Sequence, residues 1–141
     1  MVCLKISKMY IEEDKIYKID TNEELVYEQY FTLVNPLFGK NKLSKTEIKV
    51  LSKFYQVYFR YKHLGDKLVN ELLFHQETRL RIRQSVGRDL NTEFSKYSMN
   101  NIVYWLKRKG FISKKNELVH VIPMKNNIID INLRFKVKND K

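Results

Sequence analysis

The chain has 141 residues, of which 43% are hydrophobic and 30% are charged, and it contains only 4 glycines and 2 prolines. These proportions predict a folded domain and argue against a disordered or collagen-like chain. The net charge of +11 and the isoelectric point near 9.7 favour a polyanionic partner, DNA or RNA, although excess lysine also serves solubility alone.

Several kinds of site and segment are missing from the sequence. No apolar run reaches the ~20 residues of a membrane helix, and Lys5 and Lys8 interrupt the first segment, so we expect neither a membrane span nor a signal peptide. One cysteine, Cys3, and three scattered histidines predict no disulfide and no metal site. A Gly-rich phosphate loop, paired metal-binding histidines and a nucleophile elbow are also missing. We therefore expect a cytoplasmic protein that is not an enzyme and needs no cofactor.

The charge is unevenly distributed along the chain. Residues 1–39 contain four lysines against seven acidic residues, a net charge of −3, which leaves +14 on residues 40–141. We interpret residues 1–39 as a small appendage and residues 40–141 as the main, basic domain.

The first forty residues predict a hairpin and a helix. Residues 2–10 and 15–19 alternate weakly between apolar and polar side chains, with residues 12–14 as the turn between two strands. Thr21 or Asn22 is placed to cap a helix over residues 23–34, which Pro36 and Gly39 end. The expected buried side of this helix is Leu25, Val26, Tyr30 and Leu33.

A capping box opens the longest predicted helix. Ser44 and Glu47 stand three residues apart, as a reciprocal cap requires, and the helix runs to about Lys62. Two apolar stripes follow, so one side should face the core and the other the appendage or a neighbouring subunit. The stripes are Ile48, Leu51, Tyr55 and Tyr58, and Val50, Phe54, Val57 and Tyr61.

Three more helices are predicted. Residues 64–74 carry leucines at positions 64, 68 and 72, and residues 77–86 form a helix that Gly87 ends. After an irregular connection over residues 88–97, Ser98 caps a helix over residues 99–109, which Gly110 ends. Its predicted buried face is Met99, Ile102, Val103 and Leu106.

The remainder predicts β-structure. Residues 111–113 and 118–122 form strands around a turn at residues 114–117, which contains two lysines. Residues 129–137 alternate strictly between apolar and polar side chains and predict a strand with one buried face.

The order of elements from Glu77 to Val121 resembles a winged helix-turn-helix. The run Asn101-Ile102-Val103-Tyr104-Trp105-Leu106-Lys107-Arg108-Lys109-Gly110-Phe111-Ile112 resembles the end of a recognition helix and the entry to a wing, and residues 43–51 resemble the opening helix. The resemblance implies an α+β fold, a helical bundle with a C-terminal hairpin and an extra strand. The connection over residues 88–97 has ~10 residues, whereas the turn of a helix-turn-helix usually has 3–4. Either this connection holds a further helical turn or the recognition helix begins earlier.

The resemblance also implies how DNA would be bound. The recognition helix would lie in the major groove, with asparagines reading base edges and cations contacting phosphates. Residues 76–115 carry ten Lys and Arg against three acids. Some of these cations also suit a helix C-terminus or a solvated face, and the aromatic residues fit core stripes better than a stacking surface for single strands. The predicted DNA-binding residues are Arg79, Arg83, Asn100, Asn101, Tyr104, Lys107, Arg108, Lys109, Lys114 and Lys115.

A second pattern concerns origin. Residues 77–83, then a gap, then residues 101–112 and the alternating last strand, look like small proteins of crAss-like tailed phages. This resemblance implies a regulator or a replication or packaging accessory in the host cytoplasm, with double-stranded DNA as partner. The alternative is a structural protein of the virion that forms dimers or rings and contacts other virion proteins.

Overall fold

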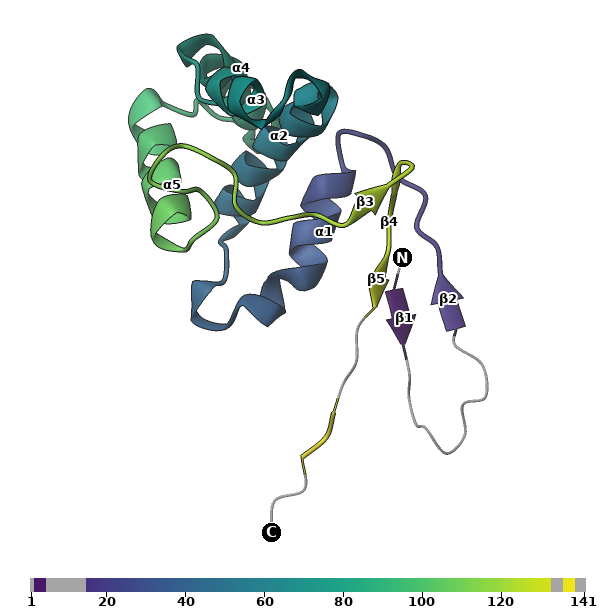
Figure 1. Cartoon of the computed structure of the whole chain (residues 1–141). Coiled ribbons are helices and arrows are strands. Elements are labelled where there is room, and N and C mark those ends of the chain that lie inside the picture. Colours follow the sequence, from purple (N-terminus) through teal and green to yellow (C-terminus); the bar gives the residue numbers. More distant parts are fainter. Residues whose placement is uncertain (1, 5–14, 133–135, 139–141) are drawn as a thin grey trace. The chain divides into compact units, whose positions relative to one another are not determined.

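The computed structural model describes residues 2–4, 15–132 and 136–138 (Figure 1). The fold is α+β and divides into two units, residues 22–120, here called the helical unit, and residues 1–21 with 121–141, here called the terminal unit. This division differs from the predicted boundary at residue 39. The reason is that the helix of residues 26–34 packs on the long helix of residues 45–61, so the change in charge does not mark a change of unit.

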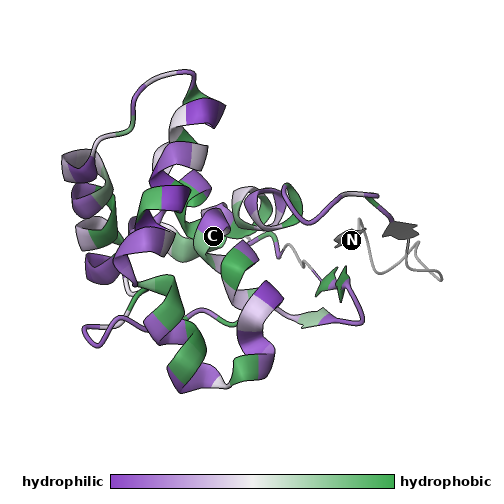
Figure 2. Cartoon of the chain, turned by 90° about the horizontal axis from the view of Figure 1, so that it is seen from above, coloured by the Kyte–Doolittle hydropathy of each residue, from purple (hydrophilic) through white to green (hydrophobic). Residues whose placement is uncertain are grey.

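The helical unit is built around one central helix. Its elements are α1 (Val26–Val34), the 3-10 segment η1 (Asn35–Asn41), α2 (Lys45–Tyr61), the 3-10 turn η2 (Lys62–Leu64), α3 (Asp66–Leu73), α4 (Gln76–Leu90) and α5 (Lys96–Arg108). Helix α2 packs against α1, α3, α4 and α5 (Figure 1). Hydrophobic and hydrophilic residues alternate along the helices (Figure 2).

The core lies along both apolar stripes of α2, since Leu51 and Tyr55 of one stripe and Val50 and Phe54 of the other are buried. The sequence predicts the core on one side only, with residues 1–39 or a neighbouring subunit on the other. The predicted capping box is present, because Ser44 Oγ accepts from the Glu47 N–H and Glu47 Oε1 accepts from the Ser44 N–H. The largest fully buried side chains come from every helix that contacts α2 and from the segment after α5. They are Phe31, Val50, Leu51, Phe54, Tyr55, Val69, Leu73, Val86, Met99, Leu106 and Ile112.

Two helices bury a face that differs in part from the predicted one. In α1 the predicted Tyr30 is buried, but so are Tyr27, Phe31 and Val34, and Leu25 is exposed, because the regular helix begins at Val26 after a turn capped by Asn22. In α3, Val69 and Leu73 are buried, whereas the predicted Leu64 and Leu68 are exposed. Gly65, with φ of 92°, interrupts the helix after Leu64 and so resets the face that meets α2.

The boundary between α4 and α5 also differs from the prediction. Gly87 does not end α4, which continues to Leu90 and is closed by Asn91 in the left-handed conformation. Gly87 is needed for close packing, since a Cβ there would lie 2.8 Å from the Thr92 carbonyl oxygen. Ser95, rather than Ser98, caps α5, and its Oγ accepts from the Ser98 N–H at 3.0 Å. The connection therefore has five residues, 91–95, instead of ten.

The segment after α5 forms a small bridged turn. Gly110 ends the helix with φ of 88°, as predicted, and Ile112 pairs with Leu118 in a single antiparallel bridge. The Ser113 N–H donates to the Glu117 carbonyl oxygen at 2.8 Å, which closes residues 113–117, here called turn 113–117. The two predicted strands around this turn are thus reduced to one bridge.

The terminal unit holds the named strands. β1 (Val2–Leu4) pairs antiparallel with β2 (Lys15–Tyr17), as predicted, and parallel with β5 (Ile131–Asn132); the predicted turn at residues 12–14 lies outside the described residues. β3 (Met124–Lys125) and β4 (Ile128–Ile129) form a hairpin around Asn126 and Asn127, which both have positive φ. The single strand predicted over residues 129–137 is therefore wrong in its first half, since β4 ends at Ile129. Residues 133–135 are outside the described part.

Candidate nucleic-acid interface

One face of α5 is exposed in the described structure. Met99, Val103 and Leu106 point into the core, and the opposite side consists of exposed residues at helical spacing. We call this set the outer face of α5. It comprises Tyr97, Asn100, Asn101, Tyr104, Trp105 and Arg108.

The cations of α5 and of the turn that follows are mostly unpaired. The helix contains no Asp or Glu and carries Lys96, Lys107 and Arg108, while Lys114 and Lys115 are exposed in turn 113–117. In the part of the chain that the structure describes, none of these five side chains has an ion-pair partner. Their charges are therefore available to an anionic ligand.

Lys109, predicted to contact phosphate, has a role inside the fold. Its Nζ lies 2.6 Å from Glu47 Oε1 and donates to the Lys42 carbonyl oxygen at 2.8 Å. Glu47 is buried at the start of α2, where it also completes the capping box. The ammonium of Lys109 thus joins the end of α5 to the start of α2.

Arg79 and Asn100 are brought together across α4 and α5. Arg79 Nη2 donates to Asn100 Oδ1 at 2.7 Å, and burial lowers the pKa of Arg79 from its ordinary value. Reading adenine needs both the oxygen and the amide of an asparagine, and Arg79 already uses one acceptor position of Asn100. Of the two predicted base-reading asparagines, which are both exposed, Asn101 is the one whose side chain has no hydrogen-bond partner within the described residues.

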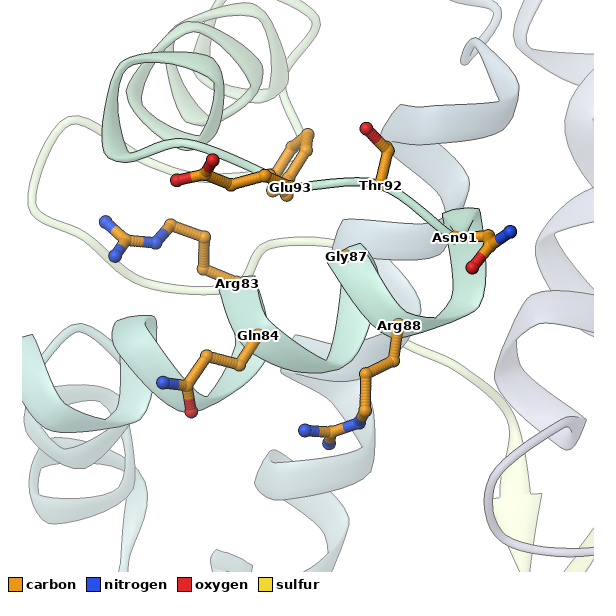
Figure 3. A pocket seen from close by; sticks show the side chains of 8 residues that line it. Arg83, Gln84, Gly87, Arg88, Asn91, Thr92 and Glu93 are labelled. Carbon is orange, nitrogen blue, oxygen red and sulfur yellow. The ribbon is translucent and has the colours of Figure 1, made fainter.

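Arg83 lies in a cleft beside the α4–α5 connection. The cleft has a volume of about 630 Å³, and Arg83 and Arg88 both line it (Figure 3). The connection runs back over α4 there, and Glu93 lies on the same side as Arg83, whereas Gln84 and Arg88 point away from the connection (Figure 3). Glu93 offsets part of the positive charge that Arg83 brings to this cleft.

Other cations in the helical unit stabilise its fold. Lys49 pairs with Glu28 of α1 at 3.1 Å, Lys53 pairs with Asp89 of α4 at 2.9 Å, and Arg60 pairs with Glu23 at 2.9 Å. These ion pairs join α2 to α4, to α1 and to the turn before α1. These three basic residues of α2 are therefore poorer candidates for DNA contacts than those of α5.

A polar cluster anchors the segment after turn 113–117. The Tyr30 hydroxyl lies 2.8 Å from His120 Nε2, and the Tyr55 hydroxyl donates to the His120 carbonyl oxygen. Burial lowers the pKa of His120 and raises the pKa of both tyrosines. With the rings of Phe31 and Phe111 beside it, His120 is placed as a neutral packing residue.

Sequence reasoning missed Lys96, Tyr97 and Trp105. The first two were assigned to a connection, because Ser98 was taken as the helix cap; Ser95, three residues earlier, is the signal that could have placed them on α5. Trp105 is 44% exposed, although the aromatic residues were expected to belong to core stripes.

No family model, no curated protein and no solved structure matches this chain. Within the described ranges, no helix combines the length and apolar character that a membrane crossing requires, and no three His, Cys, Asp or Glu side chains are grouped to hold a metal ion. The functional assignment therefore depends on the geometry and charge of α5.

Proposed function

We propose that this chain is a DNA-binding protein of the winged-helix class, with α5 as its recognition helix and turn 113–117 as a short wing. Three features support the class: α2, α4 and α5 pack on one another, five residues join α4 to α5, and a bridged turn follows α5. The observation that carries the proposal is the outer face of α5, which is exposed, free of acidic residues and flanked by unpaired cations.

The dimensions of α5 suit this role. A helix of 13 residues is ~20 Å long and fits the major groove of B-DNA. In this arrangement Asn101 would face base edges, and Lys107 and Arg108 would reach phosphates beside the groove. Lys114 and Lys115 would contact the backbone from the wing.

The test is fluorescence anisotropy of the protein with a labelled 20-base-pair duplex at several salt concentrations. Each phosphate contact contributes about 0.9 to the slope of log affinity against log salt, so Lys107→Gln and Arg108→Gln should each reduce that slope by about 1. Lys62→Gln serves as the charge-matched control, because Lys62 lies in η2, outside α5 and turn 113–117.

Two results would contradict the proposal. The first is a wild-type protein that does not bind the duplex even at ~50 mM salt, where non-specific electrostatic binding is strongest. The second is an equal loss of slope in Lys62→Gln and Lys107→Gln, which would place the binding surface elsewhere.

A second candidate function is that of a structural subunit in an oligomer, such as a phage particle. One observation favours it: a groove of about 490 Å³ lies between α2, α3 and α4, with Arg81 unpaired at its rim in the described structure. The acidic residues 1–39 of a second copy complement this rim in charge. The apolar residues that line the groove are Val57, Tyr61, Leu64, Leu72 and Ile82.

Half of the second stripe of α2 is unavailable for such a contact, since Val50 and Phe54 are buried in the chain's own core. Light scattering at high protein concentration tests the remaining half. An oligomer that Leu64→Lys disperses would support assembly through the groove, and a monomeric mass at all concentrations would exclude it.

A further inference from the structure

Three large aromatic side chains are exposed on α5. Tyr97 is 83% exposed, Tyr104 is 53% exposed and Trp105 is 44% exposed. The rings of Tyr104 and Trp105 meet edge to face, with centroids 5.4 Å apart. We call these residues the aromatic set. Exposed rings cost free energy in water, so three on one short helix mark a surface that a ligand covers.

The spacing of the aromatic set follows the axis of the helix. Tyr97 and Tyr104 are seven residues apart, which places them on the same side of α5 about 10.5 Å apart along the axis. Arg108 continues the same line one turn further. The set therefore forms a row of rings that ends in an unpaired guanidinium.

A ring of this kind binds a nucleobase best through its face. In a duplex, each base face is covered by the neighbouring base pairs, so only base edges reach a side chain in the groove. A single strand exposes its base faces, and each base stacked on an aromatic side chain contributes ~1–3 kcal/mol. The exposed rings thus match an unpaired strand better than a closed duplex.

The cations of α5 indicate that the ligand also carries negative charge. The unpaired Lys107 and Arg108 lie at the end of α5 where the row finishes, and no acid is present on the helix. The nearest acids in the chain sequence, Glu93 and Glu117, stand outside α5 in the loops before and after it. A polymer that alternates bases with phosphates satisfies both the rings and the cations.

We infer that the outer face of α5 is a stacking surface for unpaired bases, so that the preferred ligand is single-stranded DNA. This inference rests on the proposed DNA-binding function and narrows its ligand. Duplex DNA uses the same cations but leaves the aromatic set without base faces to cover, and is therefore the weaker ligand.

Trp105 offers a direct measurement, because it is the only tryptophan of the chain. Titration with a thymidine 20-mer should quench its fluorescence as a base stacks on the indole ring, and the matching duplex should leave the emission nearly unchanged. In anisotropy, Tyr97→Ala and Trp105→Ala should each weaken binding of the 20-mer about 5- to 150-fold, the equivalent of one lost stacked base.

The controls separate stacking from charge and from folding. Tyr97→Phe keeps the ring and should bind the 20-mer within about twofold of wild type, while Tyr61→Ala removes an exposed aromatic residue outside α5 and should have no effect. Both alanine variants should lose much less affinity for duplex DNA than for the 20-mer, because a closed duplex offers no base faces to these rings. Lys107→Gln should weaken both ligands.

Each result decides between the two proposals. Tighter binding of duplex than of the 20-mer, or an equal loss of both in Tyr97→Ala, would overturn the single-strand inference and leave the DNA-binding function standing. Failure of the wild-type protein to bind the duplex even at ~50 mM salt would instead remove the proposed function itself.

Discussion

Replacing Lys109 by Met tests whether a cation of α5 serves the fold rather than DNA. The change removes the ammonium that lies 2.6 Å from Glu47 Oε1 and keeps most of the side-chain volume. The Glu47 side chain is only 6% exposed, so its carboxylate loses its charged partner without gaining much access to water. The hydrogen bond to the Lys42 carbonyl oxygen is lost as well.

The structure sets the size of the effect. Breaking a buried ion pair by removing one partner costs about 3–5 kcal/mol. The Lys109 side chain is 21% exposed, so water screens the pair and reduces the expected loss to about 2–3 kcal/mol. With a urea dependence of about 1–3 kcal/mol per molar, the midpoint of unfolding should fall by about 0.7–3 M.

Urea unfolding and DNA binding are measured on Lys109→Met and on a control, Lys107→Met. Lys107 is a suitable control because its side chain has no ion-pair partner in the described residues. Lys107→Met should change the free energy of unfolding by less than about 0.5 kcal/mol but reduce the salt slope of binding. Adding Glu47→Gln to Lys109→Met should recover about 1 kcal/mol or more, because it removes the unpaired charge. The reasoning is refuted if the two lysine variants have equal stability and equal loss of DNA binding.

Two further predictions concern the helical unit. Gly87→Ala should lower the free energy of unfolding by about 1–2 kcal/mol, since the new Cβ would lie 2.8 Å from the Thr92 carbonyl oxygen; a raised melting temperature, as helix propensity alone would give, would contradict this. The free energy of unfolding should also fall between pH 7 and pH 5, because burial lowers the pKa of His120 below its ordinary 6.5 and the unfolded chain then binds a proton that the folded one resists. Urea unfolding at both pH values should show that His120→Gln reduces this dependence of stability on pH. His63→Gln, at an exposed histidine, is the control. An equal reduction in His63→Gln would show that His120 is not the cause.

Predictions from the sequence were reliable where the interacting residues lie close together in the chain. The cap formed by Ser44 and Glu47 was predictable because both partners lie within one helical turn. Gly87 was misleading because a glycine in a helix can mark either an end or a close approach, and the approaching group is the backbone of Thr92. Likewise, the start of α5 depends on which of two serines caps it, and the geometry of the connection selects Ser95.

The positive charge of the candidate site was predictable from the sequence, but the roles of its individual residues were not. Lys107 and Lys109 are indistinguishable in sequence, and the buried partner of Lys109 stands 62 residues away. Tyr104 was predicted outside the buried face of its helix, but the exposure of Trp105 was not. Aromatic residues on an amphipathic helix are usually part of the core, and only the packing of Met99 and Leu106 shows that Trp105 lies on the other side.

Lys109 and Arg79 make contacts inside the fold and are therefore poorer candidates for DNA contacts, but these contacts position the remaining residues of α5. Lys109 fixes the end of α5 to α2, and Arg79 fixes Asn100 in the first half of the helix to α4. With both contacts on its flanks, α5 cannot turn about its axis without breaking one of them. The outer face, with Tyr97 and Arg108, is therefore held toward the ligand before binding, which lowers the entropy that binding must overcome. For the proposed DNA-binding function, net charge predicts more contacts than the structure leaves available, because only the cations around α5 that have no ion-pair partner among the described residues count toward it.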